Sequence, residues 1–155
     1  MHALGVTEAV LTAKHGCGFL LWNTSTTLPD GSPYAYHVPP ELNVLRQFTD
    51  AADDAGIGHG FYYSLTNNFY LNVHSHYVSN STLLPGQQRV TQQQFEAIAL
   101  AQVTELWTQF GSLTEIWFDG GYTTDMKQEL QGLLAKHQPH AIGYNGGGIS
   151  ANPAR

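Results

Sequence analysis

Basic residues are scarce in this chain of 155 residues, which holds 6 Lys and Arg against 12 Asp and Glu and has a formal net charge of −6. It therefore lacks the cationic surface that a phosphate backbone requires, and we expect no nucleic-acid partner. Its single cysteine excludes an internal disulfide and any metal site built from several cysteines. No apolar run approaches the roughly 18 residues of a membrane-spanning helix, so we expect no membrane partner.

The first ten residues also lack the basic segment, the apolar segment and the cleavage site of a secretory signal peptide. Charged residues make up only 12% of the chain, whereas aromatic residues reach 12% and glycine occurs 16 times. The length suits one domain, because a chain of this size can bury roughly 68–70% of its unfolded surface. We therefore expect a single acidic, aromatic-rich α/β domain over residues 1–155.

Four apolar segments typical of buried strands alternate with segments of helical periodicity. The strands are expected at roughly 9–14, 59–64, 115–119 and 141–145. The helices are expected around Leu42–Ala52, from a capping box at Thr91 to Phe110, and around Met126–Leu134. This order implies parallel strands joined by right-handed crossovers, with the helices on one side. Two architectures fit it: an open doubly wound sheet, and part of a (β/α)8 barrel, which in full takes about 250 residues.

Each predicted strand ends in polar residues, and ligands of parallel sheets bind at the carboxyl ends of the strands. These ends are, in chain order, Lys14-His15, Tyr63-Ser64, Asp119 and Asn145. Strand ends are often polar, but fold stability does not require a polar group at four successive ends. We therefore expect the four ends to form one functional site.

Asp119 is the strongest candidate for a functional residue in this set. Two glycines follow it, which let a substrate approach its carboxylate closely, although an aspartate before glycine is also typical of a turn or a helix N-cap. Strand alternation places Trp117 on the same side of the sheet as Asp119. An aromatic wall beside a carboxylate suits a sugar, whose C–H face packs on the ring while its hydroxyls need acceptors. His15 is then interpreted as a donor to a substrate hydroxyl rather than as a core histidine.

Two further patterns are interpreted as structural. His74-Ser75-His76 alternates like a pair of metal ligands, but no cysteine or carboxylate lies at ligand spacing nearby, which favours a polar loop over a metal site. Gly146–Gly148 lacks the spacing of a phosphate-binding loop and does not lead into a helix. We therefore expect neither a metal nor a cofactor.

Three motifs occur in a specific order: Lys14-His15 followed by Gly18-Phe19 and Leu21-Trp22, then Gly58-His-Gly-Phe-Tyr-Tyr-Ser64, then Ile116-Trp-Phe-Asp-Gly120. Together with the closing Tyr144-Asn-Gly146 and Asn152-Pro-Ala-Arg155, they make the chain resemble glycoside hydrolase family 29, the α-L-fucosidases. The resemblance implies a retaining (β/α)8 enzyme that removes terminal α-L-fucose from glycoconjugates. This chain would supply about four parallel βα units of its barrel.

The resemblance also implies roles for individual residues. Asp119 would be the nucleophile that forms a covalent fucosyl-enzyme. Trp117 and Trp22 would bind the substrate, His15 would hydrogen-bond fucose hydroxyls, and Tyr63 would lie beside the reacting centre.

The chain departs from the family pattern in two respects. The family commonly shows Lys-His-His-Asp-Gly-Phe, whereas this chain has Gly16 after the first histidine, which puts the second histidine's contact with fucose in doubt. The chain also begins and stops inside the expected barrel. Half a barrel leaves sheet edges unpaired, so we expect self-association through them.

A retaining glycosidase needs a second carboxyl group, the acid/base, about 5–5.5 Å from the nucleophile. Glu8 and Glu115 begin strands, at the wrong end, and Asp30 in a long loop is the remaining candidate. The other acidic residues are expected on solvated helices or their flanks: Glu41, Asp50, Asp53, Asp54, Glu96, Glu105, Asp125 and Glu129. We therefore expect the acid/base beyond Arg155, and little activity from this chain alone.

Two alternatives stay open: a non-catalytic small α/β carbohydrate-binding domain, and another (β/α)8 glycosidase. Asn23-Thr-Ser25 and Asn80-Ser-Thr82 match the N-glycosylation acceptor pattern. Since the family is usually secreted or lysosomal, these sequences favour a secreted or lysosomal/vacuolar location for the full-length protein.

Overall fold

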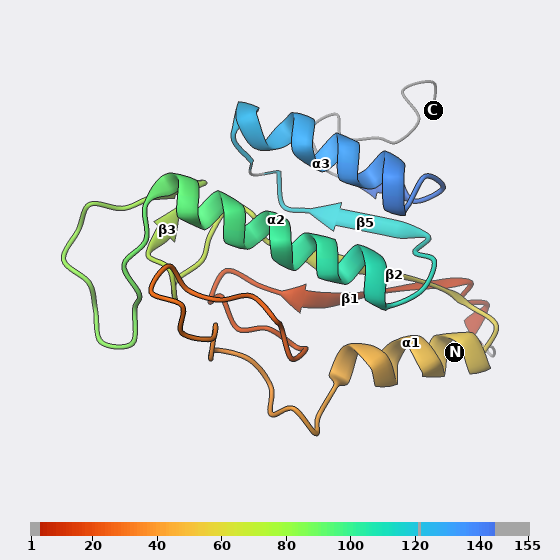
Figure 1. Ribbon diagram of the computed structural model, residues 1–155. Helices are drawn as coiled ribbons and strands as arrows, with labels where there is room; N and C mark the ends of the chain where they lie inside the picture. Colours follow the sequence, from red (N-terminus) through yellow and green to blue (C-terminus); the bar gives the residue numbers. More distant parts are fainter. Residues whose placement is uncertain (1–3, 121, 145–155) are drawn as a thin grey trace.

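The computed structural model describes residues 4–120 and 122–144. Its main sheet has four parallel strands, which are β1 (Glu8–Lys14), β2 (Gly58–Tyr63), β5 (Glu115–Phe118) and β6 (Ile142–Tyr144). The crossovers hold α1 (Val44–Asp54), α2 (Gln92–Gln109) and α3 (Thr124–His137) (Figure 1). Each of these four strands begins and ends within one residue of the bounds expected from the sequence. Asn145, the expected last residue of the fourth strand, lies outside the described residues.

The spatial order of the strands decides between the two architectures left open above. The order in space is β1-β2-β5-β6, which is also the order of these four strands along the chain. A doubly wound sheet reverses its strand order at a switch point. The described sheet has no such reversal and is therefore built like the wall of a barrel.

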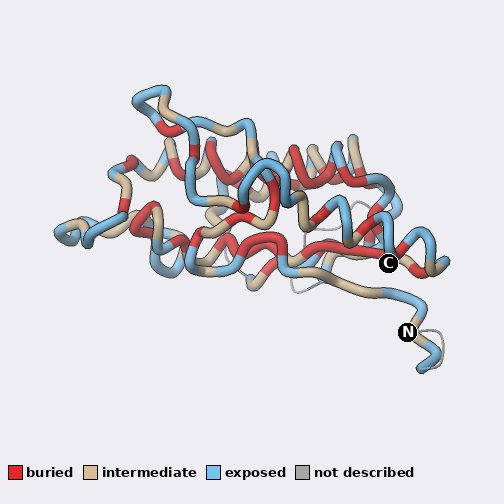
Figure 2. Tube along the Cα trace, turned by 90° about the horizontal axis from the view of Figure 1, so that it is seen from below, coloured by how far each residue is buried: buried red, intermediate tan, exposed pale blue. Residues whose placement is uncertain are grey.

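The two faces of the sheet differ in what covers them. On one face Phe61 of β2 contacts both Phe48 of α1 and Phe110, the residue that follows α2, and Phe118 of β5 contacts Trp107 of α2. Buried residues of α3 belong to the same core (Figure 2). The other face is open, because Trp117 is 37% exposed there.

The helix ends follow the signals in the sequence. The Thr91 side chain accepts the backbone N–H of Gln94, and the Gln94 side chain accepts that of Thr91, so the expected capping box begins α2. Gly56, with a φ of 62°, follows α1 as a helix stop. Leu42 was expected in this helix but lies before it and is 44% exposed.

The segment from Leu65 to Val90 shows no clear periodicity in the sequence, but it contains a hairpin of β3 (Val73–His74) and β4 (Tyr77–Val78). Its turn residues, Ser75 and His76, have φ values of 46° and 71°. Positive φ at both central residues is typical of a tight hairpin turn, which usually contains glycine or asparagine. The absence of such a dipeptide explains why the sequence did not reveal the hairpin.

Gly60 and Gly132 provide a matched test of how tightly β2 and β5 pack. A Cβ at Gly60 would overlap the backbone oxygen of Glu115, whereas one at Gly132, within α3, would meet no atom within 4 Å. We expect Gly60→Ala to lower the free energy of unfolding by about 1–3 kcal/mol, because the backbone of β5 must shift. Gly132→Ala should raise it by about 0.5–1 kcal/mol, because alanine is the better helix former.

Urea unfolding of both variants, followed by far-ultraviolet circular dichroism, measures the difference. Equal stability of the two variants would contradict the close approach of the strands at Gly60.

Candidate active site

A cavity of about 280 Å³ opens at the carboxyl end of the sheet, on its uncovered face. Its lining residues are Thr12, His15, Tyr62, Trp117 and Asp119. In Figure 1 the arrowheads of β1 and β5 point toward this end, where the long connection that holds β3 also lies. The sequence-predicted residues His15, Trp117 and Asp119 are therefore brought together around one cavity.

Both oxygens of the Asp119 carboxylate accept hydrogen bonds from residues at the end of β2 or just after it. Oδ1 accepts the backbone N–H of Leu65 at 3.2 Å, that of Thr66 at 3.3 Å and the Thr66 hydroxyl at 2.8 Å. Oδ2 accepts the hydroxyls of Ser64 at 2.6 Å and Tyr62 at 3.0 Å. The carboxylate is thus fixed by five donors, of which the sequence had pointed only to Ser64.

These donors decide the charge of Asp119. The carboxyl is half-buried, and burial would raise its pKa, but hydrogen bonds from Ser64, Thr66 and Tyr62 outweigh burial. Its pKa therefore lies below the ordinary value, because hydrogen bonds to the ionised form favour that form. Asp119 is ionised at neutral pH, as an attacking carboxylate must be.

Aromatic rings form the wall beside this carboxylate. Trp117 meets Tyr62 edge to face with 5.3 Å between the ring centroids, and His15 lies 5.7 Å from Tyr62. Burial and the neighbouring charge of Asp119 raise the pKa of Tyr62 to about 12. Tyr62 therefore keeps its proton and acts as a donor.

Residues 1–145 match the family model of the alpha-L-fucosidases. The chain belongs to the alpha-L-fucosidase family. It is similar to alpha-L-fucosidase 1 of Arabidopsis thaliana, with 27% identity over 155 residues that cover 93% of this chain and 26% of the relative. The chain thus spans about a quarter of the length of that curated relative.

Solved structures agree with this assignment. The crystal structure of an alpha-L-fucosidase from Bacteroides thetaiotaomicron is similar to this chain, with 25% sequence identity and a TM-score of 0.71. The match covers 92% of this chain and 28% of the Bacteroides chain. The alpha-L-fucosidase AlfC from Lactobacillus casei in complex with α-L-fucose shares the fold, with 21% identity and a TM-score of 0.72 over 93% of this chain and 48% of that one. The fold of this chain is therefore part of a (β/α)8 barrel, as the resemblance implied.

The structure does not bring Tyr63 or Trp22 to the cavity, and both expectations are wrong in this respect. Tyr63 is 2% exposed and donates its hydroxyl to Gln102 of α2 at 2.7 Å. Tyr62, the neighbour on the opposite face, lies opposite Trp117 and lines the cavity instead. Trp22 is 1% exposed and donates its indole N–H to Glu105 at 2.8 Å.

Strand alternation could have identified Tyr62 from the sequence. Phe61 is a core residue, and Tyr63 lies two positions later on the same face, so Tyr62 must lie on the other. Thr66 gave no such signal, because it belongs to an irregular loop.

The structure also shows the surroundings of two acidic residues, Glu105 and Asp30. Glu105, expected on a solvated helix surface, is 7% exposed and accepts hydrogen bonds from Trp22, Thr24 and Ser25. It holds the segment after β1 against α2. The side chain of Asp30 accepts the Ser32 hydroxyl, which lowers its pKa, whereas a catalytic acid needs a raised one.

Gly16, which stands where the family pattern has its second histidine, lies close to the turn that follows β2. A Cβ at this position would lie 3.2 Å from the Cβ of Asn67. The backbone oxygen of Gly16 accepts the N–H of Phe69 at 2.8 Å, so the segments that follow β1 and β2 lie side by side here. A side chain at position 16 would require Asn67 to move by a few tenths of an ångström.

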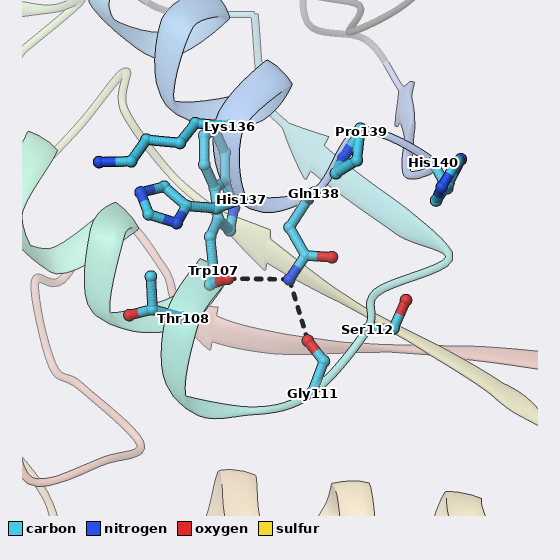
Figure 3. A pocket seen from close by; sticks show the side chains of 9 residues that line it. All are labelled: Trp107, Thr108, Gly111, Ser112, Lys136, His137, Gln138, Pro139 and His140. Carbon is cyan, nitrogen blue, oxygen red and sulfur yellow. Dashed lines mark hydrogen bonds between the residues drawn. The ribbon is translucent and has the colours of Figure 1, made fainter.

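A larger cavity, of about 510 Å³, lies at the other end of the sheet, between the C-terminal ends of α2 and α3 (Figure 3). There the Gln138 amide donates to the backbone oxygens of Trp107 and Gly111 at 2.8 and 2.9 Å, so it joins the two helix ends. Figure 3 shows His140 set apart from Lys136 and His137, and no carboxylate lines this cavity. Its position and its chemistry indicate a structural junction, and we assign the site to the smaller cavity with Asp119.

Two structural findings concern only the described part of the chain. Within residues 4–120 and 122–144, no three side chains of the His, Cys, Asp or Glu type cluster so that they could hold a metal ion. None of the helices in these ranges is long and apolar enough to cross a membrane.

Thr66→Val tests the cradle around Asp119. Removing the hydroxyl that donates to Oδ1 should raise the pKa of Asp119 toward its ordinary value. A carboxyl group whose pKa is lower in the folded state than in the unfolded state stabilises the fold at pH values above its unfolded pKa. This stabilisation is lost as the pH falls through the pKa of the folded state. The variant should therefore lose stability at neutral pH, and its Asp119 should take up a proton at higher pH than in the unaltered chain.

The carboxyl carbon signals of ¹³C-labelled aspartate, followed by NMR during acid titration, measure this change. Thr82→Val, at an exposed loop position, serves as the control and should leave the Asp119 signal unmoved. An unchanged Asp119 titration in Thr66→Val would show that this hydroxyl does not set the charge.

Proposed function

We propose that the protein containing this chain is a retaining α-L-fucosidase with Asp119 as its nucleophile. The observation that carries the proposal is an ionised carboxylate, fixed by five donors, in an aromatic-lined cavity at the carboxyl end of a partial (β/α)8 barrel. Family membership supports the reaction class, and the cavity supports the residue.

The chemistry divides into two displacements. An oxygen of Asp119 attacks the anomeric carbon, the bond from that carbon to the aglycone oxygen breaks, and the departing oxygen takes its electron pair and a proton. Water then attacks the same carbon, Asp119 leaves, and fucose is released with its original configuration.

The remaining cavity residues would hold the sugar. Trp117 offers a ring face to the apolar side of fucose, and His15 is placed to bond a hydroxyl. The AlfC structures contain α-L-fucose in one case and Fucα(1,6)GlcNAc in another, which supports a fucosylated glycan as substrate.

The second carboxyl group must come from elsewhere. Among the described residues that line this cavity, Asp119 is the sole carboxylate. We infer that the acid/base lies outside the described ranges, and that residues 1–155 belong to one catalytic barrel completed by further chain.

The two N-glycosylation sequences bear on the compartment. Asn23 and Asn80 are both exposed, so a glycan could attach at either without disturbing the core. This exposure supports a secreted or lysosomal/vacuolar location for the whole protein.

The nucleophile can be tested by trapping. The chain is incubated with 2,4-dinitrophenyl α-L-fucoside, whose leaving group departs without a proton, and its mass is measured. We expect one fucosyl group on the protein, placed on Asp119 by peptide mapping, followed by slow turnover. General acid help typically contributes about 10²–10⁴-fold, so a substrate with a poor leaving group should scarcely react.

Asp119→Asn should form no adduct, whereas Asp54→Asn, an exposed carboxylate on α1, should react like the unaltered chain. An adduct on Asp119→Asn would overturn the assignment of the nucleophile. Fucose binding without any adduct in the unaltered chain would favour a carbohydrate-binding domain instead.

A further inference from the structure

Lys14 is a buried cation next to the site that the reaction above does not use. It ends β1 and is 1% exposed. Its ammonium donates to the backbone oxygen of Asn67 at 3.1 Å and to that of His15 at 3.3 Å, and it lies 4.8 Å from the centre of the Tyr63 ring. A lysine ammonium is almost never buried so completely unless it is paired, because losing its hydration costs free energy.

These contacts join the two segments that make the site. His15 lines the cavity and follows β1, while Asn67 closes the turn whose residues hold Asp119. Within that turn the N–H of Asn67 donates to the Ser64 hydroxyl at 3.4 Å, and the N–H of Ser64 donates to the Lys14 backbone oxygen at 2.9 Å. Lys14 is therefore bonded at both its backbone and its side chain to the turn 64–67.

The charge of Lys14 matters as well as its length. Its two side-chain acceptors are neutral carbonyl oxygens, so no carboxylate in hydrogen-bond contact explains the burial of a positive charge. An apolar side chain of the same length would fill the space at lower cost. The nearby Asp119 is the negative charge that interacts favourably with it.

We propose that Lys14 is a positioning residue for the nucleophile: its ammonium holds the turn 64–67 in place and, as a cation, favours the ionised form of Asp119. This inference rests on the proposed role of Asp119. It gives the lysine of the Lys14-His15 motif a task that is distinct from sugar binding.

The positioning should depend on pH. Burial lowers the pKa of Lys14 to about 7, against the opposing effects of Asp119 and the Cys17 thiol. Beside these two groups, His15 follows it on the chain and the Tyr63 ring faces it from β2. As pH rises through about 7, the ammonium becomes a neutral amine and its charge no longer acts on Asp119.

The rate of fucosyl transfer from 2,4-dinitrophenyl α-L-fucoside to the chain tests this proposal across neutral pH. Because this leaving group needs no proton, the rate is independent of any acid/base residue. In the unaltered chain we expect it to fall as pH rises through about 7. In Lys14→Met it should be about 10²-fold lower at acidic pH, a loss typical of one preorganised charged donor, and should not depend on pH.

Lys136→Met, which removes an exposed lysine on α3, should keep the unaltered rate and pH profile. A Lys14→Met variant that retains the pH profile of the unaltered chain would overturn the proposal. No adduct in the unaltered chain would instead defeat the assignment of Asp119 itself.

NMR of the unaltered chain tests the same inference without catalysis and without a variant that must fold. Each of the three lysines, Lys14, Lys127 and Lys136, gives one ¹³Cε signal. We expect one signal to titrate near pH 7, together with the amide signals of Thr66 and Asn67. Three lysines that all titrate at the ordinary value, or amides of the turn that do not respond, would overturn the proposal.

Discussion

The rest of the site depends on one half-buried ion, the Asp119 carboxylate, which is held by donors at the end of β2 and just after it. A half-buried carboxylate costs free energy unless it is hydrogen-bonded, and here two backbone N–H groups and three hydroxyls meet that need. These donors are available only if β5 lies beside β2 in the observed register, in which Tyr63 pairs with Phe118. The parallel sheet thus fixes the charge of Asp119.

The two faces of β2 separate structure from chemistry. Phe61 and Tyr63 point toward the helices and are almost fully buried, while Tyr62 between them points into the cavity. A shift of one residue in register would exchange these roles and place an apolar core residue in the site. Gly60 lies where the backbone of β5 leaves no room for a side chain. A shift in register would bring a residue with a side chain to this place, and the two strands would clash. Strand pairing and the chemistry of the cavity are therefore under the same constraint.

The sequence predicted the strands and helices well because their apolar periodicity is strong and their caps are ordinary. It also predicted that His15, Trp117 and Asp119 converge, since strand ends of a parallel sheet must share one edge. It did not predict Thr66, which acts from an irregular loop, or the burial of Glu105, whose partners are far away in sequence. It misplaced Tyr63, although alternation from the core residue Phe61 puts Tyr63 on the helix-covered face and Tyr62 on the cavity face.

The electrostatics of the site favour the first half of a double displacement. Every hydrogen bond to Asp119 favours its negative form, and together these bonds outweigh burial; Tyr62, with a pKa of about 12, stays a neutral donor beside it. An acid/base group needs the opposite environment, one that keeps a carboxyl protonated at neutral pH. Such a group could not share the donors around Asp119, because they would ionise it as well. Under the proposed mechanism the two carboxyl groups would therefore come from separate walls of the barrel, and the described residues supply the environment of a nucleophile.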